Sequence, residues 1–308
     1  TQAPDLAGVG ARVFRPRAYW KVPRACPWRS TTGNCRRTNS LMLTTKAPLT
    51  SCAIATLLLV QWVTVSSAFG WHDKGHRVVA LIAEANLAPE TRKRIQEILP
   101  VATTLADAAV WPDHEGRSIG DLNPLHYVSI AENAEDYDQA RDCPERDCMV
   151  EALKWFLANL ADKNTPTIIK RMALRYVAHL VGDMHQPLHT GRLKDRGGAE
   201  IKVSYRGLTT NLHYFWDTDL VEMEAGTPAE LAERLGAAVS REERLRWQSG
   251  GPVQWTDESL MLVRSRAYSF GQSVELSDQY VELARPVVRT RLAQAGIRLA
   301  WLLNSAFK

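Results

Sequence analysis

The chain of 308 residues lacks several features that mark large protein classes. It contains no G-x-x-x-x-G-K-[ST] segment and no G-x-G-x-x-G segment. The glycine-rich loops that bind nucleotide phosphates in those classes are therefore absent. The chain also has no internal repeat. These absences exclude P-loop enzymes, dinucleotide-dependent enzymes and repeat solenoids.

An excess of one charge sign is also missing. The 38 basic and 34 acidic residues give a formal net charge of +4, too small to argue for binding nucleic acid through a basic surface. Residues 1–70 hold nine Lys or Arg and one Asp, which leaves 29 basic and 33 acidic residues in 71–308. With 45% hydrophobic residues the chain has the composition of a globular protein.

The first 70 residues differ from the rest and are not expected to belong to the fold. Residues 1–41 are rich in Arg, Pro, Ser and Thr without periodicity, and we interpret them as an upstream extension outside the native product. Residues 42–70 resemble a signal peptide, with Lys46, a short apolar run at 53–65, and Ala68 and Gly70 before Trp71. The alternative is a membrane helix, but the run is shorter than the ~20 residues that span a bilayer.

Cysteine is rare, and only two of the five cysteines follow residue 70. Cys143 and Cys148 lie in the segment RDCPERDC. In an exported chain such an even pair predicts a disulfide that closes a small loop. The alternative is a metal-binding pair, but no second C-x-x-C-type pair is present to complete that site.

Apolar residues recur at helical spacing through most of 71–308. The pattern predicts helices over 76–88, from Pro89, over 148–160, from Pro166 to about 184, and over 278–306, with further helix starts at Thr227–Pro228 and Thr256–Asp257. Gly197–Gly198, the segment IKVSY and Arg206–Gly207 predict a short β-hairpin. We therefore predict one compact, mainly α, multi-helix domain with a small hairpin.

All eight histidines follow residue 70, and several are spaced for metal binding. His179 and Asp183 lie four apart in a predicted helix, and His213 and Asp217 repeat this spacing. On a helix such residues share a face, so both side chains can reach one ion. His189 follows Asp183 by six residues, just past Pro187, and Asp113 in VWPDH precedes His126 in NPLHY. One His-x3-Asp pair alone is usually an ordinary hydrogen bond, whereas this combination favours a metal cluster, and nitrogen and oxygen ligands suit zinc.

With these residues in view, the chain resembles the zinc-dependent single-strand nucleases and 3′-nucleotidases, which are related to zinc phospholipase C. The resemblance covers essentially all of 71–308. It is carried by WHDKGH at 71–76, VWPD at 110–113, LHY at 125–127, HLVGDMHQPLH at 179–189, RGG at 196–198 and NLHYFWD at 211–217. The Cys143–Cys148 pair matches a small disulfide loop of that family.

The resemblance implies a trinuclear zinc domain at 71–308 with the fold of the phospholipase C/nuclease type. It implies one Zn²⁺ at Asp113, His126, His179 and Asp183. A second would be bound by the Trp71 amine and carbonyl, His76 and Asp183, and a third by His189, His213 and Asp217. Asp113 and Asp183 are the predicted catalytic residues. Because the Trp71 amine is free only after cleavage, the resemblance also favours processing before this residue.

The implied activity is hydrolysis of the O3′–P bond in single-stranded DNA and RNA to 5′-phosphate products, with 3′-nucleotidase activity. Tyr127 matches an aromatic residue that stacks on a base, and the alternative is a tyrosine of the core. One departure is Ala199, where the family often has Asn, so base preference is not predicted. Arg117 or Lys194 could contact phosphate, but a solvated cation is the favoured interpretation of both. His72, His114 and His185 are expected at the surface or next to the metal ligands, and Trp111 and Trp216 in the core.

Other hypotheses stay open at the level of sequence. A zinc phospholipase C shares the same implied scaffold, and a non-enzymatic metal-binding helical domain needs no catalysis. For the leading hypothesis we expect a secreted or periplasmic monomer that keeps no stable membrane anchor after signal removal. Its partners would be single-stranded nucleic acids and 3′-nucleotides.

Overall fold

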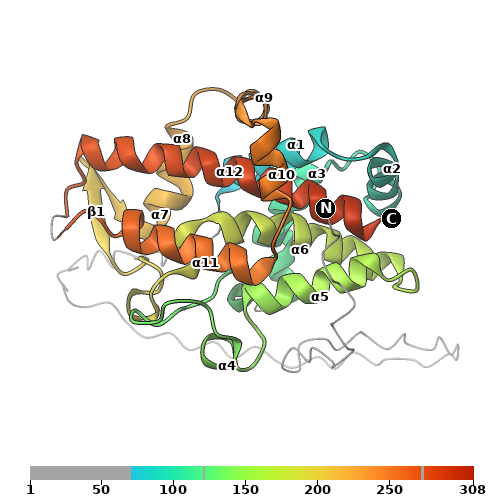
Figure 1. Ribbon diagram of the computed structural model, residues 1–308, viewed down its shortest axis with the longest axis horizontal. Coiled ribbons are helices and arrows are strands. Elements are labelled where there is room, and N and C mark those ends of the chain that lie inside the picture. The colour runs from blue at the N-terminus through green and yellow to red at the C-terminus, as the bar shows by residue number, and fades with distance from the viewer. Residues whose placement is uncertain (1–70, 121, 272–273) are drawn as a thin grey trace, which may run out of the picture. The chain divides into compact units, whose positions relative to one another are not determined.

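The computed structural model describes residues 71–308 except 121 and 272–273. The extension and signal peptide predicted over 1–70 lie outside the described residues. Within the described part the fold is mainly helical with one two-stranded sheet, as predicted (Figure 1). None of its helices combines the length and apolar character needed to cross a membrane.

The longer helices are α1 (Asp73–Ala85), α2 (Pro89–Ile98), α5 (Met149–Ala161), α6 (Thr167–His185), α9 (Pro228–Ala238), α11 (Pro252–Leu262) and α12 (Asp278–Ala306). The shorter ones are α3 (Leu105–Val110), α4 (Gln139–Asp142), α7 (Leu212–Tyr214), α8 (Leu220–Glu222) and α10 (Arg241–Trp247). The strands are β1 (Lys202–Tyr205) and β2 (Leu208–Asn211).

Helix α6 is the centre of the fold. It packs against α3, α5, α11 and α12, and Figure 1 shows it enclosed between them. From Ala173 to His185 all but one of its residues are buried, so the C-terminal half is surrounded by protein on every side. Any polar side chain on this half must find its partners inside the molecule.

Local sequence signals explain where several helices begin. Thr104, Thr227 and Ser240 each form a capping box with the acidic residue three positions later. The predicted start at Thr256–Asp257 is wrong, because α11 begins at Pro252 and Thr256 lies inside it. The Thr256 hydroxyl donates to the Pro252 carbonyl within the helix (2.8 Å). In sequence alone, a Thr followed by Asp cannot be distinguished from a helix cap.

The hairpin and the disulfide both agree with their predictions. Strands β1 and β2 pair antiparallel with Tyr205 opposite Leu208. The turn between them places Arg206 at φ 50° and Gly207 at φ 82°, the left-handed backbone that a two-residue hairpin requires. Cys143 and Cys148 form a disulfide across a separation of five residues, just before α5. They are therefore not a metal-binding pair.

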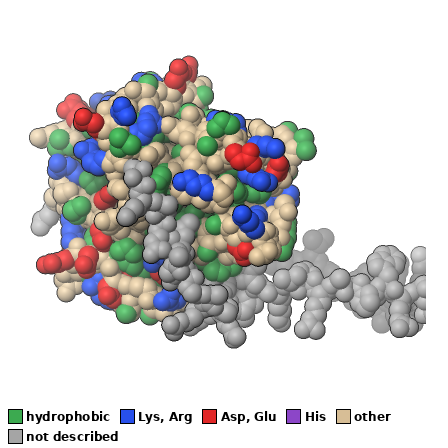
Figure 2. All heavy atoms as spheres, turned by 45° about the vertical axis from the view of Figure 1, so that its right-hand side comes forward, with side chains coloured by type: hydrophobic (Ala, Val, Ile, Leu, Met, Phe, Trp, Pro, Cys, Tyr) green, Lys and Arg blue, Asp and Glu red, His purple; other side chains and the backbone are tan. Residues whose placement is uncertain are grey.

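The visible surface carries no broad basic tract. Figure 2 shows Lys and Arg side chains scattered among Asp, Glu and hydrophobic side chains on the face that it draws. This agrees with the formal charge of −4 in 71–308. On this face, no continuous positive surface is present that would attract an anionic substrate. The polar residues buried around α6 are the other candidates for such a site.

Candidate metal centre

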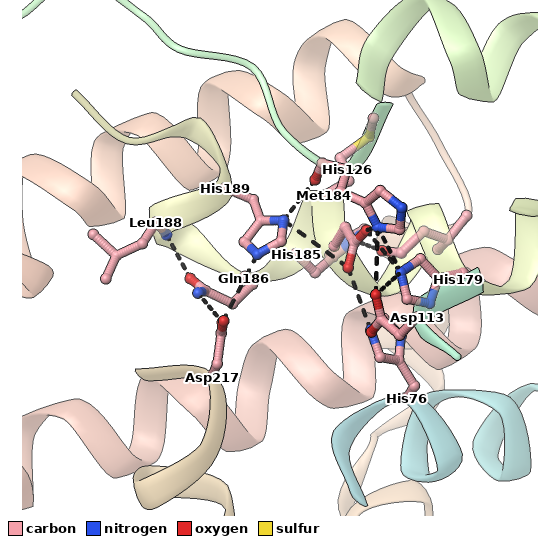
Figure 3. A network of polar contacts seen from close by, with 12 residues as sticks. His76, Asp113, His126, His179, Met184, His185, Gln186, Leu188, His189 and Asp217 are labelled. Carbon is pink, nitrogen blue, oxygen red and sulfur yellow. Dashed lines mark hydrogen bonds and ion pairs between the residues drawn. The ribbon is translucent and has the colours of Figure 1, made fainter. Parts of the chain in front are cut away.

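Three groups of His and Asp side chains lie together at the C-terminal end of α6 (Figure 3). In each group the potential ligand atoms all lie within 4.8 Å of one another. The first donor group is Asp113, His126 and His179, the second is His76, His179 and Asp183, and the third is His189, His213 and Asp217. All eight side-chain donors implied by the family resemblance are therefore in these groups.

The first donor group joins α6 to two short 3₁₀ turns. Asp113 ends the turn Trp111–Asp113, and His126 ends the turn Asn123–His126. His126 Nδ1 lies 2.9 Å from His179 Nε2. Asp113 Oδ1 lies 3.8 Å and 3.7 Å from the same two nitrogens. The three donor atoms converge on one point without a helix being distorted.

Asp183 stands between the first two groups. Its Oδ2 lies 3.2 Å from His126 Nδ1 and 3.2 Å from His179 Nε2, whereas its Oδ1 lies 3.3 Å from His76 Nε2. The His76 ring, which comes from α1, stacks on the His179 ring at a centroid distance of 3.9 Å. One carboxylate therefore presents one oxygen to each of two neighbouring clusters, which is the arrangement of a bridging ligand.

The third donor group is built by a helix continued as a π-turn. His213 in α7 and Asp217 in the π-helical turn Phe215–Asp219 lie four apart, with His213 Nε2 3.1 Å from Asp217 Oδ2. His189 Nε2 lies 3.8 Å from Asp217 Oδ1. His189 Nδ1 also lies 3.9 Å from Asp183 Oδ1, so the third group adjoins the other two.

Backbone carbonyls fix the tautomer of three of these histidines. His179 Nδ1 contacts the Ala109 carbonyl at 2.7 Å, His189 Nδ1 the His126 carbonyl at 2.6 Å, and His213 Nδ1 the Gly197 carbonyl at 2.7 Å. A carbonyl can only accept, so each Nδ1 carries a proton and Nε2 is the nitrogen that faces the cluster as a possible ligand. This is the arrangement found around metal-binding histidines.

Several buried polar atoms in this region have no hydrogen-bond partner. Both ring nitrogens of His76 and Oδ1 of Asp183 are among them, although His76 and Asp183 are completely buried. His76 Nε2 and Asp183 Oδ1 lie 3.3 Å apart, within ion-pair distance, but make no hydrogen bond. A cation placed between them would be bound by both atoms. Unpaired buried groups cost free energy, so the residues present fit a cation at that position.

The charges within the cluster are strongly coupled. Burial alone would raise the pKa of Asp183, but the charges of His179 and His189 and the hydrogen bonds from His126 and His179 hold it well below its usual range. Burial lowers the pKa of His189, but Asp183 and Asp217 outweigh this effect and raise it to about 10. The charges of Asp183 and His189 therefore favour one another across the cluster.

His76 behaves differently from the other rings. Burial, and then the charge of His179, lower its pKa. This direction favours the neutral ring, which is the form that offers a lone pair to a metal ion.

Trp71 is fully buried and packs beside the second donor group. Gly75 is required there, because a Cβ at this position would lie 2.5 Å from the Trp71 Cβ. The next backbone amide, that of His72, donates to the Asp217 carbonyl at 3.2 Å. The start of the described chain is thus tied to the cluster, while the ligand role of the Trp71 amine stays a prediction.

The other residues singled out in the sequence differ in their exposure and contacts. Tyr127 is 37% exposed, which excludes the alternative of a core tyrosine. Trp216 is buried and donates to the Tyr280 hydroxyl, whereas Trp111 is only partly buried. His114 is exposed and pairs with Asp73. His72 and Lys194 are also exposed, and Arg117 Nη2 lies 3.9 Å from Asp113 Oδ1.

Sequence reasoning missed Gln186. This residue is fully buried, its Nε2 donates to Asp217 Oδ1, and its Oε1 accepts from the Leu188 amide. The bond from Leu188 fixes the orientation of the amide, so the donor end must face Asp217. Gln186 lies between two motif residues in HQPLH, but no spacing rule distinguishes it from an ordinary turn residue.

A serine nucleophile is not built here. Residues 116–120 spell G-x-S-x-G, the pattern of a hydrolase nucleophile turn. Ser118, however, lies in the 3₁₀ turn Glu115–Ile119 and its hydroxyl donates to the Glu115 carbonyl at 2.7 Å. No strand precedes it among the described residues, so the strand-to-helix context of that motif is missing.

Comparison with known proteins agrees with this geometry. A family model described as S1/P1 nuclease matches residues 71–308. The chain belongs to the S1/P1 nuclease family. It is 33% identical to nuclease S1 of Aspergillus oryzae over 279 residues, covering 80% of this chain and 94% of that protein.

Two further relatives extend the comparison. Endonuclease 4 of Arabidopsis thaliana is 32% identical over 280 residues, covering 81% of this chain and 93% of the relative. Nuclease P1 of Penicillium citrinum is 27% identical over 262 residues, covering 76% and 97%. Membership of this family identifies the chain as a nuclease, a hydrolase that acts on nucleic acids.

Proposed function

We propose that residues 71–308 form a zinc-dependent nuclease domain that cleaves the O3′–P bond of single-stranded DNA and RNA, leaves 5′-phosphate products and removes the phosphate of 3′-nucleotides. The observation that carries this proposal is the carboxylate of Asp183, which turns one oxygen toward each of two adjacent donor groups. Such a bridge favours paired ions at one reaction centre over separate structural ions.

The residues that would hold three Zn²⁺ follow from the donor groups and the family resemblance. Asp113, His126, His179 and Asp183 would hold the first ion. The Trp71 amine and carbonyl, His76 and Asp183 would hold the second, and His189, His213 and Asp217 the third. When bound, zinc supplies Lewis acidity that polarises phosphate oxygens and lowers the pKa of water.

The protein's own contribution is to position these groups and to balance their charge. The carbonyls of Ala109, His126 and Gly197 hold three imidazoles with the Nε2 lone pair toward the site. Burial of Asp183 removes competing water from the carboxylate, which strengthens its interaction with any cation. We assign the catalytic role to Asp113 and Asp183, as the family resemblance implies.

Tyr127 is the proposed base-binding residue. It directly follows His126 and is exposed beside the first donor group, so its ring is open to a base. Stacking needs an unpaired base and tolerates any of them, which supports single-strand preference without sequence preference. No contact in this proposal depends on a 2′-hydroxyl, so DNA and RNA would both be substrates.

We further propose that the active chain begins at Trp71, after removal of residues 1–70, and that it acts outside the cytoplasm. A free α-amine has a pKa near ~8 and can donate a lone pair, whereas a peptide nitrogen cannot. The test is a variant that keeps one extra residue before Trp71. Unchanged zinc content and activity would contradict the role of this amine.

The activity itself is tested on the chain expressed with residues 1–70 in a secreting host and purified after processing with zinc present. Turnover is measured on denatured DNA, RNA, 3′-AMP and phosphatidylcholine. We expect cleavage of both nucleic acids and release of phosphate from 3′-AMP, with no turnover of lipid. Lipid turnover without nucleotide turnover would support the phospholipase alternative and contradict the proposal.

A further inference from the structure

Arg175 lies on the same helix as the metal centre and has an unusual environment. It precedes His179 by four residues in α6, so the two share a helix face and their Cα atoms lie roughly 6 Å apart along the axis. Its guanidinium carbon lies 4.1 Å from the centroid of the Trp111 ring. Trp111 is two residues before Asp113, a member of the first donor group.

The Arg175 side chain has no anionic partner among the described residues. Its Nε is buried without a hydrogen bond, and Glu115, although close enough to affect the charge, makes no ion pair with it. Arg291 and Arg298, which are also buried, both pair with Glu258. Arg175 is thus a partly buried cation whose counter-charge the described part of the protein does not supply.

The stacked arrangement also holds the guanidinium in place. Trp111 packs closely against Gly116, where a Cβ would lie 3.1 Å from the Trp111 ring. Trp111 also makes an edge contact with Tyr176 at a centroid distance of 6.4 Å. An arginine whose guanidinium lies over a fixed indole has restricted freedom, which suits recognition of a phosphate by its planar set of donors.

We propose that Arg175 binds a phosphate of the substrate strand adjacent to the one that is cleaved. The inference rests on the proposed nuclease function and adds a subsite to it. Long side chains on a helix lean toward its N-terminus, so the Arg175 head group lies beyond His179 on the side away from Asp183. A strand with its scissile phosphate at the donor groups would pass its next phosphate over this position.

The experiment compares Arg175→Ala and Arg175→Lys with Arg94→Ala. Arg94 is an exposed arginine of α2 whose charge is paired with Glu90 and Glu97, so its removal changes the net charge equally. Binding is measured by fluorescence anisotropy in the zinc-loaded enzyme, with a short labelled single-stranded oligonucleotide whose O3′ atoms are replaced by methylene groups so that it cannot be cleaved. The unmodified oligonucleotide is kept for the kinetics. KM is measured separately on the oligonucleotide and on 3′-AMP in the otherwise unchanged enzyme, and thermal unfolding reports folding.

We expect Arg175→Ala to weaken oligonucleotide binding about tenfold and to reduce the slope of log K against log salt by about 0.7, the value for one lost contact with a single strand. KM for the oligonucleotide should rise about tenfold more than KM for 3′-AMP, which has no adjacent phosphate. Arg175→Lys keeps the charge but loses the planar fork, so it should recover only part of the affinity.

Two results would overturn the inference. One is equal affinity and equal salt slope for Arg175→Ala and Arg94→Ala, which would leave Arg175 with a packing role seen only in thermal unfolding. The other is equal loss on the oligonucleotide and on 3′-AMP. Failure of the proposed function would look different, because the unsubstituted enzyme would then cleave neither substrate. Failure of this inference alone would leave the unsubstituted enzyme active.

Discussion

Two buried polar clusters share helix α6, and only one of them is complete. His185 lies two residues after Asp183 and belongs to the complete cluster with Glu258, Arg291 and Arg298. His185 Nδ1 donates to the Val181 carbonyl at 2.7 Å and its Nε2 accepts from Arg298 at 2.9 Å. Arg298 and Arg291 donate to Glu258 at distances of 2.6–2.7 Å. All of these groups have partners.

The donor groups are built from His and Asp without an arginine, and they leave some buried polar atoms without a hydrogen bond. Both His76 nitrogens and Asp183 Oδ1 make no hydrogen bond, whereas both nitrogens of the His185 ring are hydrogen-bonded. Burial, together with the positive charges of Arg291 and Arg298, holds the pKa of His185 well below its usual value. The complete cluster satisfies its own charges with protein partners, whereas the donor groups could hold metal ions.

The largest effect is expected from substitution of Asp183, the residue that the first two donor groups share. Asp183→Asn removes the charge that serves both of the first two groups and keeps the size of the side chain. We expect activity on denatured DNA to fall by on the order of 10³-fold and zinc content to drop by two ions. Activity is followed as kcat/KM and zinc by elemental mass spectrometry; retention of either near the unsubstituted value would argue against a bridge.

The matching change in the complete cluster should affect stability rather than metal. Glu258→Gln leaves the buried Arg291 and Arg298 without their carboxylate, and because Glu258 is itself partly exposed the cost is about 2 kcal/mol of unfolding free energy. Urea unfolding measures the loss, and zinc content is measured on the folded fraction. A loss of zinc at unchanged stability would show that the two clusters are not separate in function.

A smaller effect is expected where one residue orients a ligand. Gln186→Glu replaces an amide donor by a carboxylate directed at Asp217, since the Leu188 amide still fixes the other oxygen. Loss of such an orienting group typically weakens metal binding 10–100-fold, so competition with a chelator should remove one ion before the others. Gln186→Ala, which removes the donor without adding charge, should weaken that ion less.

The smallest effect tests the close approach of α1 to α6. A Cβ on Gly182 would lie 2.8 Å from His76 Nδ1, so Gly182→Ala should displace His76 and weaken zinc binding at the second donor group by about tenfold. Gly236→Ala in α9 is the control, because a Cβ there meets nothing within 4 Å. The control should keep its zinc and gain up to about 1 kcal/mol of stability. Equal zinc affinity in both variants would refute the steric argument.

The comparison also shows what the sequence can and cannot predict. Periodicity predicts α6, and the four-residue spacing of His179 and Asp183 places both on one face. The turn residues Arg206 and Gly207 likewise predict the hairpin. Both predictions depend only on residues that are close together in the sequence. The false helix start at Thr256 comes from the same kind of signal, because Thr–Asp looks like a cap whether or not Pro252 has already begun the helix.

Contacts between distant segments lie beyond these rules. His76 meets Asp183 only because α1 packs on α6, and periodicity gives no pairing of helices. The family resemblance supplies that grouping, but it does not supply Gln186 or the stacking of Arg175 on Trp111. Nothing in spacing separates His185, which is bound within the complete cluster, from His189, which lies six residues after Asp183 in the third donor group.

The central claim is that the three donor groups form a site for three zinc ions, and the most direct test is to count these ions. The chain is purified after processing with zinc present, dialysed, and analysed by elemental mass spectrometry against protein concentration. The account predicts three zinc ions per chain, falling to one in Asp183→Asn. A chain that retains no zinc, or a count that Asp183→Asn leaves unchanged, would contradict it.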